Sequence, residues 1–83
     1  MTETIRGRFD RTTTRWHMII AALPKHGISR ATAFMAAADE AAIYVSAGLS
    51  PVEAHDELHR LANAHGLDDD DAVKWIITRA LDE

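Results

Sequence analysis

Apolar residues recur three or four positions apart in four stretches of this chain, which is the spacing of an amphipathic helix. The pattern predicts helices over residues 13–23, 30–47, from Pro51 onward, and 69–81, and no stretch alternates as a strand would. The residues expected in the core are Trp16, Ile19, Ile20, Leu23, Ala33, Phe34, Ala37, Ala41, Tyr44, Val45, Ala54, Leu58, Leu61, Ala62, Val73, Ile76, Ile77 and Leu81. The sequence therefore predicts an all-α fold, a compact bundle of four helices. The alanine-rich helix over 30–47 lets neighbours approach closely, so we expect it to be central.

Three short junctions separate the predicted helices, and each consists of a glycine, an apolar residue, and a serine or aspartate. They are His26-Gly27-Ile28-Ser29, Ala47-Gly48-Leu49-Ser50 and His65-Gly66-Leu67-Asp68. Glycine can close a helix in the left-handed conformation, the apolar residue packs back on it, and serine or aspartate caps the next helix. The second junction also has Pro51 at the first helical position and Glu53 at the reciprocal capping position. We therefore expect tight helix-to-helix corners.

The 83 residues are enough for one small core and 47% of them are hydrophobic, which is typical of a folded domain. Residues 1–10 show no helical repeat and place Gly7 between two arginines, so we expect a basic arm or linker over 1–10 and a single helical-bundle domain over 11–83. No signal peptide or membrane span is visible, which favours a cytoplasmic protein without membrane contact. The chain has no cysteine, which excludes disulfides, thiolate metal sites and a cysteine nucleophile.

A domain of this size has little room for both a core and a deep catalytic cavity. No phosphate-cradling glycine loop or serine nucleophile elbow is present. Asp39 and Glu40 are adjacent and would diverge by about 100° around their helix, so they do not form a catalytic pair. We expect no catalytic residues, no cofactor and no enzyme activity of the chain by itself.

Charge is divided along the chain. Residues 1–30 carry six basic and two acidic side chains, a net +4, whereas residues 31–83 carry three basic and eleven acidic ones, a net −8. The candidate nucleic-acid-binding residues are Arg6, Arg8, Arg11, Arg15, Lys25 and Arg30, with Thr12, Thr13 and Thr14 as further donors. Arginine forks bind phosphates in two places, and Trp16 could stack on an unpaired base or lie in the core. The alternative is an ordinary solvated surface with local ion pairs.

Two other clusters have simpler structural explanations. His55 and His59 would lie one turn apart on a helix, but zinc needs three or four ligands, so we expect no metal site. The run Asp68–Asp71 suits the start of a helix, where acidic groups meet exposed N–H groups and the helix dipole. Ala62 and Gly66 have the spacing of a DNA-reading helix-turn-helix, yet these aspartates would face phosphates, which excludes that role.

The stretch from Arg30 to Leu81 resembles the small helical domain that follows the catalytic domain in primases and primase-polymerases of phages and plasmids, the primase C-terminal domain. The resemblance is carried by Gly66, Leu67, Asp68, Asp71, Ala72, Ile76 and Thr78, and upstream by Ala47-Gly48-Leu49, Leu58 and Ala62. Trp75 and Ala31 depart from that pattern, which has threonine and asparagine there. The resemblance implies an accessory module that helps a primase hold single-stranded template DNA or nucleotide and couples priming to a helicase.

Two alternatives remain open at the level of sequence. The residues Ser50, Glu53, Ala54, Leu58, Ala62, Ile76 and Ile77 also resemble the RNA-binding ANTAR domain of antitermination regulators. That family has an apolar residue where Asp69 stands, an Ala-x-Gly pattern where Asp39 and Ala41 stand, and a more basic surface. The third interpretation is a protein-interaction module without nucleic acid, whose signature would be an exposed apolar patch anchored by Trp75, Met18 or Met35.

Overall fold

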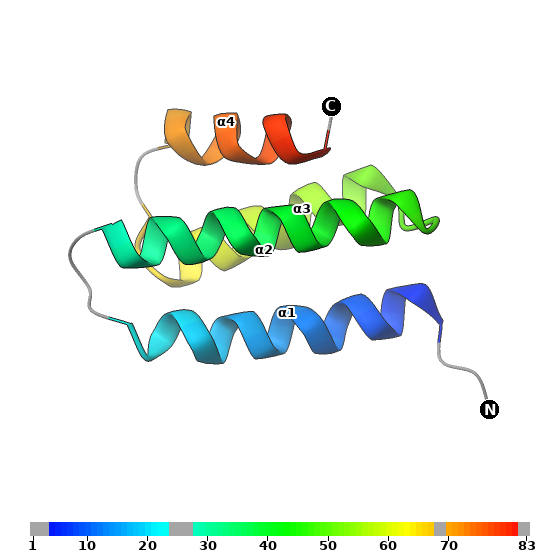
Figure 1. Cartoon of the computed structure of the whole chain (residues 1–83), viewed down its shortest axis with the longest axis horizontal. Helices are drawn as coiled ribbons and strands as arrows, with labels where there is room; N and C mark the ends of the chain where they lie inside the picture. Colours follow the sequence, from blue (N-terminus) through cyan, green and yellow to red (C-terminus); the bar gives the residue numbers. More distant parts are fainter. Residues whose placement is uncertain (1–3, 24–27, 68–69, 82–83) are drawn as a thin grey trace.

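The computed structural model describes residues 4–23, 28–67 and 70–81, and in these the fold is all-helical. The helices are α1 (Ile5–Ala21), α2 (Ile28–Ser46), α3 (Pro51–Ala64) and α4 (Asp70–Leu81). Helices α1, α2 and α4 lie side by side in one layer, and α3 passes behind α2 (Figure 1). The predicted four-helix bundle is confirmed. No helix of the described residues is long and apolar enough to cross a membrane.

Helix α2 occupies the centre of the bundle. It packs against each of the other three helices, whereas α1 and α4 lie on its opposite sides and do not contact each other in the described residues (Figure 1). Ala37, Ala38 and Ala41 of α2 are almost completely buried. Their small side chains let three neighbours approach one helix, as the composition of this stretch predicts.

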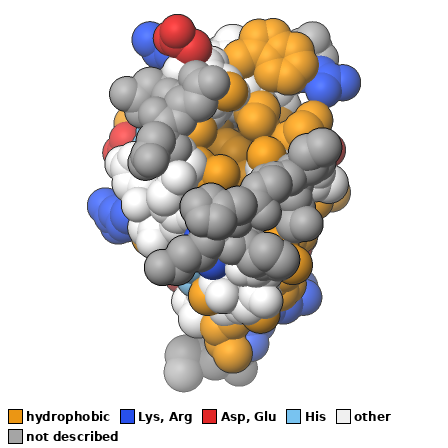
Figure 2. All heavy atoms as spheres, turned by 90° about the vertical axis from the view of Figure 1, so that its left-hand side faces the viewer, with side chains coloured by type: hydrophobic (Ala, Val, Ile, Leu, Met, Phe, Trp, Pro, Cys, Tyr) orange, Lys and Arg blue, Asp and Glu red, His pale blue; other side chains and the backbone are white. Residues whose placement is uncertain are grey.

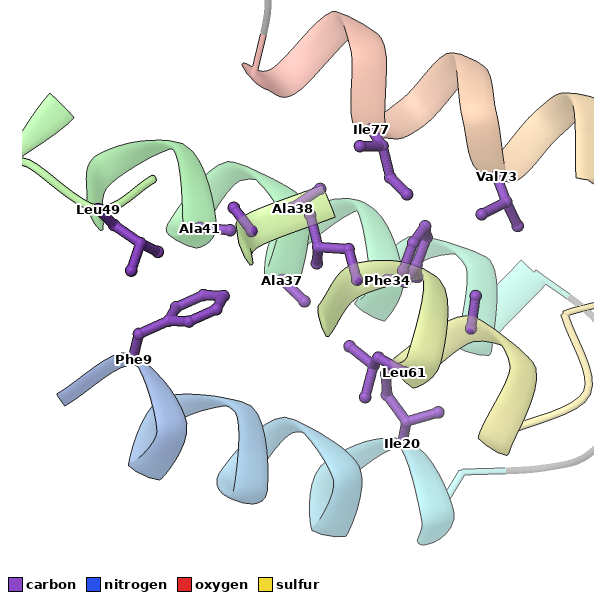
Figure 3. Close-up of a cluster of buried hydrophobic side chains, with 13 residues drawn as sticks. Phe9, Ile20, Phe34, Ala37, Ala38, Ala41, Leu49, Leu61, Val73 and Ile77 are labelled. Atoms are coloured by element: carbon purple, nitrogen blue, oxygen red, sulfur yellow. The ribbon is translucent and has the colours of Figure 1, made fainter. Parts of the chain in front are cut away.

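The core is built where the apolar faces of the four helices meet. Phe34, Ile20, Leu61 and Ile77 are the largest side chains that are fully buried, one from each helix. Val73 and Ile77 point from α4 toward α2, and Phe9 lies near Leu49 (Figure 3). All four core positions predicted for α3 are buried. Of the residues predicted for the core, Ile19 is 40% exposed, and seven are only partly buried: Trp16, Leu23, Ala33, Tyr44, Val45, Ile76 and Leu81.

Helix α1 begins eight residues earlier than the apolar pattern predicts. The side chain of Thr4 accepts a hydrogen bond from the Gly7 N–H at 3.0 Å and caps the helix, which then runs from Ile5 to Ala21 instead of 13–23. The expectation of an arm over residues 1–10 is therefore wrong for residues 5–10, which are helical; residues 1–3 lie outside the described residues. Phe9 is buried and anchors this segment in the core.

Two of the three predicted corners are Schellman motifs, in which the helix closes on a glycine with a positive φ. The Leu49 N–H donates to the Tyr44 carbonyl at 2.9 Å, and the Leu67 N–H donates to the Ala62 carbonyl at 3.0 Å. Gly48 and Gly66 have φ values of 120° and 71°. These bonds satisfy carbonyl groups that a helix end otherwise leaves unpaired.

The predicted N-caps agree less well with the structure than the predicted glycine corners do. Ser50 occupies the N-cap position before Pro51, but its side chain makes no capping hydrogen bond, so the predicted capping box is absent. Helix α2 begins at Ile28, one residue before the predicted cap Ser29. Gly27 and Asp68 lie outside the described residues.

Alanine and asparagine substitutions should change stability differently at the two corner glycines, because the two glycines have different φ values. Nothing lies within 4 Å of a Cβ built at either glycine, so the cost of a side chain comes from the backbone alone. We expect Gly66→Ala to lower the free energy of unfolding by about 1 kcal/mol and Gly66→Asn by less, because asparagine tolerates the left-handed region. At Gly48, whose φ lies beyond that region, asparagine should be no milder than alanine. Urea denaturation of the four variants measures this, and equal rescue by asparagine at both sites would contradict it.

Candidate nucleic-acid interface

Arg6, a candidate phosphate ligand, is held by carboxylates of its own chain. Its guanidinium lies 3.0 Å from Asp10, 3.5 Å from Glu53 and 3.1 Å from Glu57. Arg6 stands in the first turn of α1, where the helix dipole disfavours a cation, and the two glutamates of α3 offset this. Burial lowers the pKa of Arg6, but the attraction of the three carboxylates outweighs it and the pKa lies above its ordinary value. The structure thus ties Arg6 into the α1–α3 contact.

Arg30 is committed to the ends of two helices. Its guanidinium donates to the Leu23 carbonyl at 3.0 and 3.3 Å and to the His65 carbonyl at 3.0 Å. These carbonyls follow the C-terminal ends of α1 and α3, where a cation is favoured by the helix dipole. Arg30 therefore holds α1 and α3 together as a structural clamp. The remaining candidate, Lys25, lies outside the described residues.

Arg8, Arg11 and Arg15 remain as an exposed group on α1, which we call the arginine stripe. All three side chains are exposed. With 100° of rotation per residue, positions 8, 11 and 15 fall within about 60° of one another on the helix surface, and they span about 10 Å along its axis. Of the six predicted basic residues, these three arginines are the ones among the described residues that share one exposed face of α1.

Thr12, Thr13 and Trp16 pack into the interior of the bundle, whereas Thr14 is exposed. The Thr12 and Tyr44 hydroxyls are 2.7 Å apart, and the buried Thr13 hydroxyl donates to the Phe9 carbonyl at 2.8 Å. The exposed Thr14 hydroxyl donates to the Asp10 carbonyl at 3.0 Å. The indole N–H of Trp16 donates to Glu40 at 3.0 Å, joining α1 to α2. Thr12 and Trp16 thus fasten α1 to α2, whereas Thr13 and Thr14 bond carbonyls of α1 itself. Of the three threonines expected as donors, only Thr14 is exposed.

Removing the Tyr44 hydroxyl should reveal the cost of an unsatisfied buried group. Thr12 is 4% exposed, so Tyr44→Phe leaves its hydroxyl without this partner, and we expect the free energy of unfolding to fall by about 1–2 kcal/mol. Combining Tyr44→Phe with Thr12→Val should cost less than the sum of the two single changes, because no polar group is then stranded. Denaturant unfolding of the double-mutant cycle tests this, with Thr14→Val, at an exposed threonine, as the control. Strict additivity would show that the two hydroxyls are not coupled.

No candidate metal centre is found within the described residues. No group of three or more histidine, aspartate or glutamate side chains is placed to hold a metal ion there. The run 68–71 meets the start of α4 at Asp70, as expected for an acidic helix start, while Asp68 and Asp69 lie outside the described residues. Sequence reasoning missed a different histidine pair, His17 and His65, whose ring nitrogens approach to 3.0 Å. They are 48 positions apart, so no local spacing could have indicated the pair.

Several large apolar side chains remain exposed on the surface. Met18 is 70% exposed, Ile43 68% and Trp75 59%. A groove between α2 and α4 is lined by Met35, Asp39, Ile76, Arg79 and Ala80. Figure 2, a view of the left-hand end of Figure 1, shows hydrophobic side chains gathered in its upper half, the side of α4. Arg79 lies over the Trp75 ring at 5.4 Å from its centroid, an exposed cation–π pair.

Comparison with known proteins identifies no relative of this chain. No protein-family model matches it, no curated protein is similar to it, and no solved structure resembles it.

Proposed function

We propose that this chain is a non-catalytic, nucleic-acid-binding helical module that acts as an accessory of a replicative primase or primase-polymerase. The observation that carries the proposal is the arginine stripe, three exposed guanidinium groups on one face of α1. Guanidinium groups bind phosphate oxygens bidentately and remain charged at any physiological pH. A row of them binds a sugar-phosphate backbone without reading its sequence, which suits a module that holds template.

The resemblance to the primase C-terminal domain supplies the biological setting for this proposal. Its residues include Gly48, Leu49, Gly66 and Leu67, which form the two Schellman corners, and the core residues Leu58 and Ala62. They account for the fold of α2 to α4, while the stripe lies on α1, outside the stretch that carries the resemblance. The proposed partners are accordingly single-stranded template DNA or nucleotide on α1 and adjoining catalytic and helicase domains elsewhere on the surface.

Replacing the arginine stripe should abolish binding to single-stranded DNA. We expect the chain to bind a labelled oligothymidylate at low salt and to lose most of that affinity between about 50 and 200 mM salt. In Arg8→Ala/Arg11→Ala/Arg15→Ala, binding should be lost, or the slope of log affinity against log salt should fall in magnitude by about 2, since each single-strand phosphate contact contributes about 0.7. Fluorescence anisotropy at several salt concentrations measures both quantities.

A matched control has the same change in charge on other faces of the bundle. Arg60→Ala/Lys74→Ala/Arg79→Ala removes three exposed cations from α3 and α4 and should leave the affinity close to that of the unaltered chain. Equal losses in the two triple variants would mean that net charge, and not the stripe, governs binding. Absence of binding at low salt would exclude the proposal, and preference for stem-loop RNA would favour the ANTAR-like alternative.

A protein-interaction role without nucleic acid is the second candidate, and the exposed Trp75, Met18 and Met35 favour it. These are the side chains expected as anchors of such a surface, and aromatic and methionine side chains are enriched at interfaces. If the partner is a second copy of this chain, sedimentation velocity over a range of chain concentrations distinguishes the two roles. Reversible dimerisation weakened by Trp75→Ala, together with no DNA binding, would favour this candidate.

A further inference from the structure

The imidazoles of His17 and His65 meet between two helices that are not neighbours in the sequence. His17 stands in the second half of α1, and His65 is the C-cap residue of α3. Their Nδ1 and Nε2 atoms are 3.0 Å apart, and the ring centroids are separated by 5.1 Å with the planes tilted by 45°. Both residues are half-buried. A hydrogen bond between two imidazole nitrogens needs one donor and one acceptor, so at least one ring must be neutral.

A permanent positive charge lies beside this pair. Arg30 from α2 donates to the backbone carbonyl of His65 at 3.0 Å and holds the Leu23 carbonyl at the end of α1 as well. Two acceptors fix the guanidinium in place, so it does not withdraw when the imidazoles gain protons. Among the described residues, the charged groups that act on His65 are His17 of α1 and Arg30 of α2, and both oppose its protonation.

We infer that His17 and His65 form an acid-sensitive latch that joins α1 to the C-terminal end of α3. While at least one of the two rings is neutral, one ring can donate and the other can accept, and the latch is closed. With both rings protonated, neither nitrogen can accept, and two imidazolium ions and the Arg30 guanidinium stand together. Repulsion among the three cations then pushes the ends of α1 and α3 apart against the Arg30 hydrogen bonds, while the described residues at the opposite end of the bundle contain no such pair. This inference does not depend on the proposed function.

The direction of the pH effect follows from the proton on His65. Burial, then His17, then Arg30 lower the pKa of His65 below its ordinary value of 6.5. Between that lowered pKa and 6.5 the unfolded chain binds more protons than the folded one, so the free energy of unfolding decreases as the pH falls. The stabilising contribution of the neutral ring is complete well above pH 6.5 and is gone below the folded pKa. The latch is thus closed at neutral pH and opens in acid.

Amide hydrogen exchange tests the latch against an internal reference. The Leu67 N–H and the Leu49 N–H occupy the same position in the two Schellman corners, but only Leu67 lies beside the histidine pair. We expect the opening constant at Leu67, after correction for intrinsic exchange, to rise by up to about tenfold for each pH unit between 6.5 and the lowered folded pKa of His65, and to level off below that pKa, as a one-proton process requires. Leu49 should show no such rise. Two-dimensional NMR of the full chain follows both amides from pH 7.5 to 4.5.

Three histidine variants complete the experiment. In His65→Gln the acid-dependent opening at Leu67 should disappear, because the titrating ring is gone. In His17→Gln it should weaken, because burial and Arg30 still lower the pKa of His65 but the second imidazolium is absent, and this weakening is the readout if His65→Gln fails to fold. His59→Gln removes an exposed histidine of α3 and should behave as the unaltered chain. The inference is overturned if Leu49 and Leu67 lose protection in parallel, if His65→Gln keeps the acid response, or if His17→Gln leaves that response unchanged.

Discussion

The bundle depends on one packing constraint, which is that a single helix must bury three of its sides. Helix α2 contacts α1, α3 and α4, and it does so with alanines at the closest approaches and Phe34 filling the space between them. A larger residue at Ala38 or Ala41 would push a neighbour away, because protein interiors are close-packed and accept extra volume only with strain. The same constraint leaves the outer surface of α2 uncovered, and its exposed residues include Met35 and Ile43.

Exposure divides the arginines of α1 and α2 into two groups, with Arg6 and Arg30 partly buried and the other three exposed. Arg6 and Arg30 satisfy groups of their own chain, three carboxylates in one case and two carbonyls in the other. Arg8, Arg11 and Arg15 lie on the solvent side of α1. Position around the helix decides this division. Arg6 faces the glutamates of α3, whereas the exposed Arg8 borders a hollow between α1 and α2 that Asp39 and Glu40 also line. Charge along the sequence therefore overestimates the surface offered to a polyanion.

Local patterns predicted much of the fold, and non-local contacts account for what they missed. Glycine followed by an apolar residue marked two corners, because the Schellman bonds lie within six residues. The start of α1 was missed since Thr12 and Thr13 occupy buried positions where the apolar repeat expects hydrophobic residues, and a tyrosine from α2 makes that burial acceptable. The contacts of Arg6 and Arg30 could not be predicted from local spacing, because their partners Glu57 and His65 are 51 and 35 positions away. Only tertiary structure brings such partners together.

The seam between α1 and α2 has a consequence for cooperativity. Besides its apolar contacts it is closed by two polar pairs, Thr12 with Tyr44 and Trp16 with Glu40. Helices α2, α3 and α4 pack mutually and enclose Phe34, Leu61 and Ile77, and α1 adds the buried Phe9 and Ile20 to the same core. Polar pairs contribute less net free energy than the same area of apolar packing. Weakening either polar pair therefore loosens first the contact of α2 with α1, the helix that carries the exposed arginines.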